Sequence, residues 1–444
     1  MTINWYGIVF LFFITFIVLI KKSFRFLDAF ILFIAFSSTA IFFVDDETAV
    51  NLPFTLFFLA FLAFLIRSFL DSKIVIIKEQ KISIIWLITI GLIAIISEIM
   101  PFIINGSYNV LDRYGSLVYY AEEIPLIPKI QWITQLLYFL IGLLITFLVA
   151  TTYNKVSDLK NLLRLLIAGI SFLIFWGWFE YLCFFTGIPY PYEIFDHIGM
   201  SREGTLEIDG WPRMSSITLE PSYLAQIMIP VTPFLFWFSK SDTQIKLFNK
   251  KALRGLYVIS IITALLAYTT TGILGAFAVA GLWLKNKLKT FNKRSRYFLI
   301  TVYFLTLLGA IFFIVQYLIK VSESFSGVER FKTFYLGFEY FLDFPILGLG
   351  WGVFPTYDFI VNLLVNFGII GTIAFSILLY NIFTKLSGKK RKNNILRPLY
   401  IASAESLFLL LIVSQLSGFI YHSQYFWMYL GIALTVSSLN EDGQ

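Results

Sequence analysis

The feature that most constrains this chain is a series of long apolar runs that recur along almost its whole length. Runs of about 17–25 residues match what an α-helix needs to cross roughly 30 Å of hydrocarbon. Charged residues make up only 14% of the chain, whereas a soluble protein of this size carries about a quarter. The pattern therefore predicts an all-α polytopic membrane protein rather than a set of soluble domains.

Hydropathy predicts about 12–14 transmembrane helices in a single integral membrane domain that covers residues 1–444. The segment 256–284 has basic residues on both flanks, so we expect two short helices joined at 269–272 rather than one long helix. The approximate bounds are 4–20, 26–44, 52–70, 83–105, 131–152, 162–186, 217–238, 256–270, 272–284, 297–319, 357–383, 399–420 and 424–438.

Basic residues are concentrated in alternate loops, which fixes the orientation by the positive-inside rule. The rule predicts an outer amino terminus and a cytoplasmic carboxyl terminus. The net charge of +7 then follows from orientation, so nucleic acid is not an expected partner. The two larger outer loops are 187–216 and 320–356. The outer face holds only these basic residues: Arg113, Lys129, Arg202, Arg213, Lys320, Arg330 and Lys332.

The absence of certain motifs limits which reactions the chain can catalyse. No phosphate-binding loop of the G-x-x-x-x-G-K type is present, and ATP is absent outside the cytoplasmic membrane. A reaction on the outer face must therefore use a substrate that is already activated. The single Cys183 offers neither an intramolecular disulfide nor a zinc cluster. Acids at 45–47, and the pair Glu207 and Asp209, could hold a divalent ion, but adjacent loop acids are more commonly solvated. We expect no metal and no cofactor.

The first candidate site precedes the helix predicted at 217–238. Arg213 lies in the loop, and Glu220 is followed by Pro221, which is tolerated at a helix start because that position needs no N–H. Glu220 then lies in the first turn, where the helix dipole favours a carboxylate. It is either a capping acid or a general base held beside an arginine at the edge of a cavity.

The second candidate site begins with Arg330 and Lys332, at the start of an expected amphipathic helix that lies flat on the membrane. These cations either extend to the lipid headgroups or form an anion site, since a guanidinium can bind a phosphate through two hydrogen bonds. Gly348, Gly350 and Gly352 then allow a tight turn. The apolar residues of the helix recur at helical spacing: Phe331, Phe334, Tyr335, Phe338, Phe341 and Leu342.

Ionisable groups inside membrane spans need a partner or water. Pairing or protonation accounts for most of them, but Asp358 opens a helix next to the glycine turn and is the candidate for function. The two histidines, His197 and His422, both fall on the outer side and are expected to be solvated. The intramembrane carboxylic acids are Glu98, Glu180, Glu405 and Asp358.

The order of these motifs resembles a known family. An outer-loop arginine precedes a Glu-Pro-Ser helix start, and a threonine-rich hairpin tip, TTTGILGA, follows. Another arginine then precedes the turn PILGLG and a helix containing NFGIIG. This arrangement, over roughly residues 200–375, resembles the bacterial O-antigen polymerase and ligase superfamily, the Wzy and WaaL proteins. The individual motifs are degenerate, whereas their order is fairly specific.

The resemblance implies a GT-C-like architecture in the bacterial cytoplasmic (inner) membrane, with its active site on the periplasmic side. It implies a saccharide substrate linked to undecaprenyl diphosphate, and a reaction that inverts the anomeric carbon. Arg213 and Arg330 would bind the diphosphate while an acceptor hydroxyl attacks. A chain-length regulator and a flippase are candidate partners. Further substrate-binding candidates are Lys332, Arg202, Tyr223 and Tyr357.

One departure separates two activities within the family. The ligases resemble one another in a His-Asn pair that stands here as Tyr357 and Asp358. The absent histidine and the Glu220-Pro221 pair favour a polymerase of O-antigen or capsule over a ligase that acts on lipid A core. Glu220 would be the base and Asp358 would orient sugar hydroxyls, or the two roles are exchanged. Other classes are a lipid-linked saccharide transporter, which would predict internal repeats, and a non-catalytic scaffold.

Overall fold

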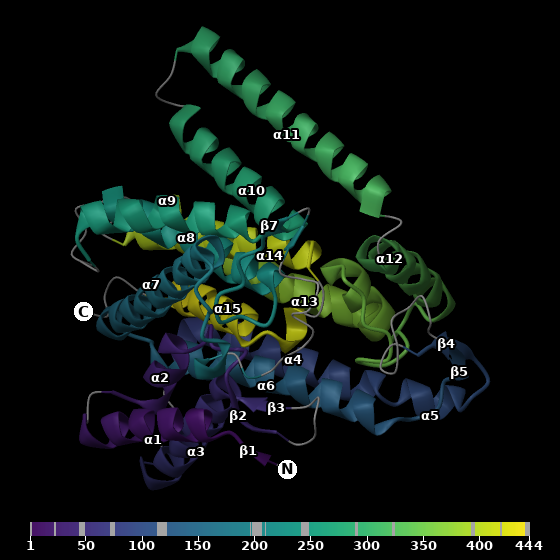
Figure 1. The fold of residues 1–444 in the computed structure, drawn as a ribbon. Coiled ribbons are helices and arrows are strands. Elements are labelled where there is room, and N and C mark those ends of the chain that lie inside the picture. The colour runs from purple at the N-terminus through teal and green to yellow at the C-terminus, as the bar shows by residue number, and fades with distance from the viewer. Residues whose placement is uncertain are drawn as a thin grey trace.

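The computed structural model describes residues 2–21, 24–43, 49–71, 76–112, 122–195, 197, 207–208, 210–240, 248–288, 292–321, 325–391, 396–417 and 420–439. The chain is mainly helical in these ranges (Figure 1). The helices are α1 Trp5–Ile20, α2 Phe26–Leu32, α3 Leu52–Asp71, α4 Lys81–Ser97, α5 Met100–Ile104, α6 Ile130–Thr152, α7 Val156–Thr186, α8 Pro221–Lys240, α9 Lys250–Leu266, α10 Thr270–Lys287, α11 Lys293–Val321, α12 Phe325–Asp343, α13 Phe359–Arg391, α14 Arg397–Gln415 and α15 Gln424–Ser438. The short strands are β1 Thr2–Ile3, β2 Ala40–Phe43, β3 Ala49–Asn51, β4 Asn109–Leu111, β5 Glu123–Pro125, β6 Glu207–Ile208 and β7 Trp211–Pro212.

In the described part of the chain, 7 helical segments are long and apolar enough to cross a membrane. They are α3, α4 with α5, α6, α7, α8, α13 and α14. Helix α1 is apolar but shorter, at 16 residues. The protein is therefore a multi-pass membrane protein built mainly from helices. A total of about 12–14 spans remains a prediction, as does the GT-C-like architecture.

The span predicted at 26–44 is wrong. Helix α2 ends at Leu32, and the chain then enters β2, which pairs antiparallel with β1 and with β3. The polar residues between the two elements explain the break. Thr39 donates its hydroxyl to the Phe195 carbonyl at 2.7 Å, and the Ser38 carbonyl accepts the His197 N–H at 3.0 Å. These groups bond to a distant loop instead of continuing the helix.

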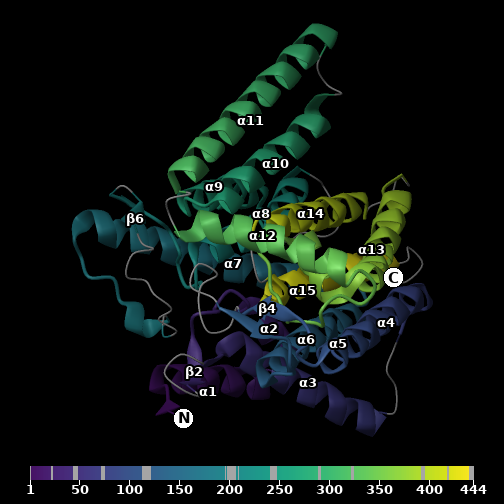
Figure 2. The ribbon, with the colours of Figure 1, turned by 90° about the vertical axis from the view of Figure 1, so that its right-hand side faces the viewer.

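The prediction of two helices over 256–284 is confirmed, because α9 ends at Leu266 and α10 begins at Thr270. Tyr268 adopts a positive φ of 47° in the connection. The Thr269 hydroxyl caps α10 by accepting the Gly272 N–H at 3.0 Å. In both views of the ribbon, α10 and α11 extend away from the other helices (Figure 1; Figure 2).

The core is formed by helices from both halves of the chain. Helix α8 packs against α9 and α14, α15 packs against α6, and α13 packs against α4 and α14. Every residue of α15 is buried. Pro230 and Pro233 lie inside α8, and side chains compensate the disrupted backbone bonding. The Thr232 hydroxyl donates to the Ile229 carbonyl at 2.8 Å, which is the carbonyl that Pro233 leaves without its helical N–H partner.

The glycines of the PILGLG and NFGIIG motifs allow two segments to touch. A Cβ on Gly348 would lie 2.5 Å from the Val365 carbonyl oxygen, and one on Gly368 would lie 2.3 Å from that of Ile346. Both glycines also have positive φ, at 71° and 62°. Asn366 fixes the same turn, because its amide donates to the Phe354 carbonyl and accepts the Phe354 N–H, both at 3.0 Å. This contact sets where the chain enters α13, at Tyr357 and Asp358.

Candidate functional site

The loop that leads into α8 is held by a buried acid. Glu180 of α7 is 7% exposed and accepts hydrogen bonds from the Ser215 N–H at 3.1 Å, the Ser215 hydroxyl at 3.0 Å and the Ser216 N–H at 2.6 Å. Ser216 has a positive φ of 55° and donates its hydroxyl to the Leu173 carbonyl at 2.8 Å. Glu180 is therefore paired with backbone, and it fixes the short segment between Arg213 and Glu220.

Glu220 lies at the start of α8 with its side chain exposed. Its carboxylate accepts the Ser222 hydroxyl at 3.0 Å, whereas its carbonyl accepts the N–H groups of Tyr223 and Leu224. The backbone thus begins the helix while the carboxylate faces solvent. Pro221 is the first helical residue, so α8 begins four residues later than predicted, and Glu220 precedes the helix instead of lying in its first turn.

Three tyrosines lie near Glu220 and the start of α13. Tyr223 is within electrostatic range of both the Glu220 carboxylate and the Tyr357 side chain. The rings of Tyr223 and Tyr425 meet edge to face at 6.5 Å, and Tyr425 also lies within the field of Glu220. The structure therefore brings Tyr223 and Tyr357 to the same side of the molecule as Glu220.

Arg330 of α12 reaches the same region. Its Nη1 donates to the Thr270 hydroxyl at 3.2 Å and to the Leu416 carbonyl at 3.1 Å. Its guanidinium carbon lies 5.4 Å from the centre of the Tyr357 ring, within range of a cation–π contact. Arg330 thus joins α10, the end of α14 and the start of α13.

Asp358 lies between Arg330 and Gln415. The Gln415 amide donates to its carboxylate at 3.4 Å, and the Arg330 charge acts on it. Burial raises the pKa of Asp358 above its ordinary value near 3.8, although Arg330 and the Gln415 hydrogen bond both act to lower it. A carboxyl whose pKa is shifted by burial beside a specific cation is typical of functional sites.

The tip of α10 supplies a further positive element. Thr270 is the first residue of an 18-residue helix, whose N-terminal N–H groups carry a partial positive charge. Its hydroxyl lies 3.2 Å from Arg330 Nη1. The positive end of α10 and the guanidinium therefore meet at one point, which is a favourable place for an anion.

The segment that carries Arg213 bonds to the α9–α10 hairpin through its backbone. The N–H of the next residue, Met214, donates to the Leu266 carbonyl at 3.0 Å, at the end of α9. Arg213 itself is half-buried. The α9–α10 turn is therefore flanked by the segment that carries Arg213 and by Arg330.

The other predicted site residues are placed differently. Lys332 lies on α12 two residues beyond Arg330, and residues at that spacing point to different faces of a helix. Arg202 lies outside the described residues, as do Asp45, Asp46, Glu47 and Asp209. Among the described residues, no group of 3 or more His, Cys, Asp and Glu residues could hold a metal ion.

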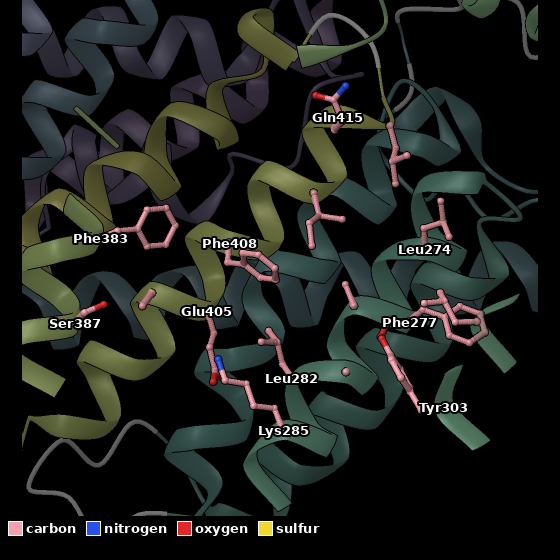
Figure 3. Close-up of a pocket in the computed structure, with 16 residues that line it drawn as sticks. Leu274, Phe277, Leu282, Lys285, Tyr303, Phe383, Ser387, Glu405, Phe408 and Gln415 are labelled. Atoms are coloured by element: carbon pink, nitrogen blue, oxygen red, sulfur yellow. The ribbon is translucent and has the colours of Figure 1, made fainter. Parts of the chain in front are cut away.

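A cavity of about 740 Å³ lies between α10, α11, α13 and α14 and ends beside Asp358 and Arg330. Figure 3 shows Gln415 at one end, Glu405 and Lys285 at the other, and Phe408 between them. Most of the lining is apolar. We call this space the α10–α14 cavity.

Glu405 is held at the inner end of the α10–α14 cavity by neutral donors. The Trp237 indole N–H donates to one carboxylate oxygen at 2.7 Å, and the Asn286 amide donates to the other at 3.1 Å. This is the pairing that an acid inside the membrane requires.

His422 is half-buried, so the expectation of a fully solvated loop histidine holds only in part. Its ring packs 5.5 Å from the Tyr138 ring, and burial lowers its pKa to about 4. His197 is half-buried, with Nε2 2.7 Å from the Glu193 carbonyl oxygen.

Sequence reasoning missed Gln415, Tyr425 and the positioning role of Glu180. Gln415 and Tyr425 come from segments that carry no outer-loop cation or acid, so nothing local distinguishes them. Thr270 lies in the threonine-rich tip, to which the sequence alone assigns no role. No known family model and no curated protein sequence matches the chain.

Proposed function

We propose that this protein is a polysaccharide polymerase that joins oligosaccharide repeat units carried on undecaprenyl diphosphate. The observation that carries the proposal is that Arg330, Asp358 and the tip of α10 lie together beside one end of an apolar cavity. Glu220 lies nearby, within electrostatic range of Tyr223 and Tyr425. Cations beside an apolar cavity suit a lipid with an anionic head. Exposed and half-buried carboxylates beside them suit proton transfer.

In the proposed reaction, an acceptor hydroxyl oxygen bonds to the anomeric carbon of the donor saccharide. The bond from that carbon to the diphosphate oxygen breaks, and undecaprenyl diphosphate leaves with the electron pair. The hydroxyl proton passes to a carboxylate. Arg330 and the N-terminal end of α10 stabilise the charge that develops on the departing diphosphate. No nucleotide is needed, because the lipid diphosphate is already activated.

The two carboxylates have different surroundings, which supports different roles. Asp358 lies within the field of Arg330, on the side of the proposed leaving group. Glu220 is exposed and hydrogen-bonded to the Ser222 hydroxyl, so an acceptor sugar can approach it from solvent. We therefore propose Glu220 as the base and Asp358 as the group that orients sugar hydroxyls. The working face would be the outer side of the bacterial cytoplasmic membrane.

The test is purified protein supplied with repeat units on undecaprenyl diphosphate, with products separated by length. A ladder of longer lipid-linked chains is expected. No ladder would overturn the proposal, and a single transfer to lipid A core would mean a ligase. Glu220→Gln is expected to abolish the ladder while leaving the thermal unfolding midpoint unchanged. A Glu220→Gln variant that polymerises normally would remove the proposed base.

A further inference from the structure

The α10–α14 cavity continues from the proposed headgroup site into the membrane-spanning part of the fold. Two of its lining residues, Gln415 and Leu416, bond to Asp358 and to Arg330 respectively. A third, Leu274, lies one turn into α10 from Thr270. The outer end of the cavity is therefore formed by the elements that hold the cationic site.

The opposite end of the cavity is polar. Lys285 and Ser387 line it, and Glu405 is fixed there by Trp237 and Asn286. From Glu405 to Gln415, α14 rises by about 15 Å, at about 1.5 Å per residue. The cavity thus has an outer end whose lining residues bond to Arg330 and Asp358, a polar inner end, and an apolar middle between them.

The apolar middle exists because small residues face one another across the helices. Ala278 and Gly281 of α10 and Ala404 of α14 line it, and the rings of Phe408 and Tyr303 border it. Gly281 is also required by packing, since a Cβ there would lie 2.5 Å from the Tyr303 hydroxyl. A larger residue at Ala278 or Ala404 would therefore occupy the space directly.

Two donors at the outer end are not used within the described part of the protein. The Nε atom of Arg330 and the hydroxyl of Thr271, the second residue of α10, are buried without a hydrogen-bond partner there. With the Nη1 group of Arg330 and the N-terminal N–H groups of α10, they form a set of hydrogen-bond donors around one positive charge. A diphosphate has more acceptor oxygens for these donors than a phosphate diester has.

We propose that the α10–α14 cavity binds the isoprenoid tail of a polyprenyl diphosphate, so that one amphiphile occupies the tail cavity and the Arg330 site together. This inference rests on the proposed function for the identity of the lipid. Charge complementarity selects the ligand, because an anionic head meets Arg330 and the tip of α10 while an apolar tail meets the cavity wall. Anchoring the tail would hold the anomeric carbon at a fixed distance from Glu220 and Asp358.

The test is photolabelling of the full chain in phospholipid nanodiscs. The probe is a polyprenyl diphosphate with a diazirine on one of the first isoprene units, and labelled peptides are identified by mass spectrometry. Label is expected on α10 or α14. Ala278→Trp, which fills the cavity, is expected to reduce labelling about tenfold, equivalent to about 1.4 kcal/mol. Ala280→Trp is the matched control, because Ala280 lies on the same helix with its side chain exposed and does not line the cavity.

Competition separates an isoprenoid tail from an ordinary acyl chain. Unlabelled undecaprenyl diphosphate is expected to displace the probe, whereas phosphatidylglycerol at the same concentration is not. Equal displacement by both lipids would overturn the inference. Label on helices that do not line the cavity, such as α4 and α6, would also overturn it, as would undiminished labelling of Ala278→Trp. Ala404→Trp, on the facing helix, provides a second variant if Ala278→Trp does not fold.

The polymerase proposal and the tail-site proposal can fail independently. Label in the cavity that Ala278→Trp removes, without a ladder from the unmodified protein, would leave the tail site standing and overturn the polymerase. A ladder without label on α10 or α14 would leave the polymerase standing and overturn the tail site.

Discussion

Glu180 of α7 and Ser216 of the loop before α8 are joined by a hydrogen bond of 2.6 Å, from the Ser216 N–H to the carboxylate. The same carboxylate accepts the N–H and the hydroxyl of Ser215. A single buried acid therefore holds a backbone segment that has left regular structure, with Ser216 at positive φ. That segment ends at Glu220, so the position of the proposed base depends on a residue in a different helix.

Glu180→Ala is expected to lower the thermal unfolding midpoint of the purified protein. The substitution leaves the N–H groups of Ser215 and Ser216 buried without an acceptor, at about 1–3 kcal/mol for each. Glu180→Gln keeps one acceptor oxygen and should lie between the two. Glu220→Ala is the control, because its side chain is exposed. Equal midpoints for Glu180→Ala and the unmodified protein would mean that the loop does not depend on this acid.

Arg330→Ala is expected to slow polymerisation about 10²–10³-fold, the usual effect of removing one donor from a developing negative charge. Arg330→Lys should retain part of the rate, because it keeps the charge but loses the planar guanidinium, whose Nη1 bonds to both Thr270 and Leu416. The measurement is the initial rate of ladder formation. Glu339→Gln, an exposed change on the same helix, should have no effect. A full rate for Arg330→Ala would exclude the guanidinium from the reaction.

Asp358→Asn is expected to raise the unfolding midpoint at neutral pH and to reduce polymerisation. Burial raises the folded-state pKa of Asp358 above its unfolded value near 3.8, so the folded protein binds this proton more tightly. Stability from the group is therefore present below pH 3.8 and is lost as the pH rises through the folded pKa. The difference in midpoint between variant and unmodified protein should grow over that range. A difference that is independent of pH would contradict the raised pKa.

Hydropathy and basic flanks predicted the membrane class and the two helices α9 and α10, because both depend on local sequence alone. They failed at 26–44, where α2 ends at Leu32. The apolar run looked continuous, but Thr39 bonds to the Phe195 carbonyl, a partner 156 residues away. Such a contact is decided by the tertiary fold and leaves no local pattern.

Some residues of the candidate site were likewise predictable from the sequence, and others were not. Arg330, Asp358 and Glu220 stood out because each is an ionisable residue where the topology predicts the outer face. Gln415 could not be singled out, since an amide at the end of an apolar helix becomes informative only when Asp358 lies against it. The sequence predicts that Glu180 is paired or protonated, but its partners are two backbone N–H groups and the Ser215 hydroxyl, which only the fold identifies.

Gly368→Ala is expected to destabilise the protein more than any substitution of a solvent-facing glycine. A Cβ at Gly368 would lie 2.3 Å from the Ile346 carbonyl oxygen, and its φ of 62° costs an L-residue about 1–2 kcal/mol before any clash. The backbone must then separate from the PILGLG turn, which moves Asp358 away from Arg330, so polymerisation should fall together with the unfolding midpoint. Gly388→Ala is the matched control on the same helix, where a Cβ meets nothing within 4 Å. Alanine there should raise stability by about 0.5–1 kcal/mol. Equal midpoints for the two variants would mean that the contact between the two glycine motifs does not hold the turn.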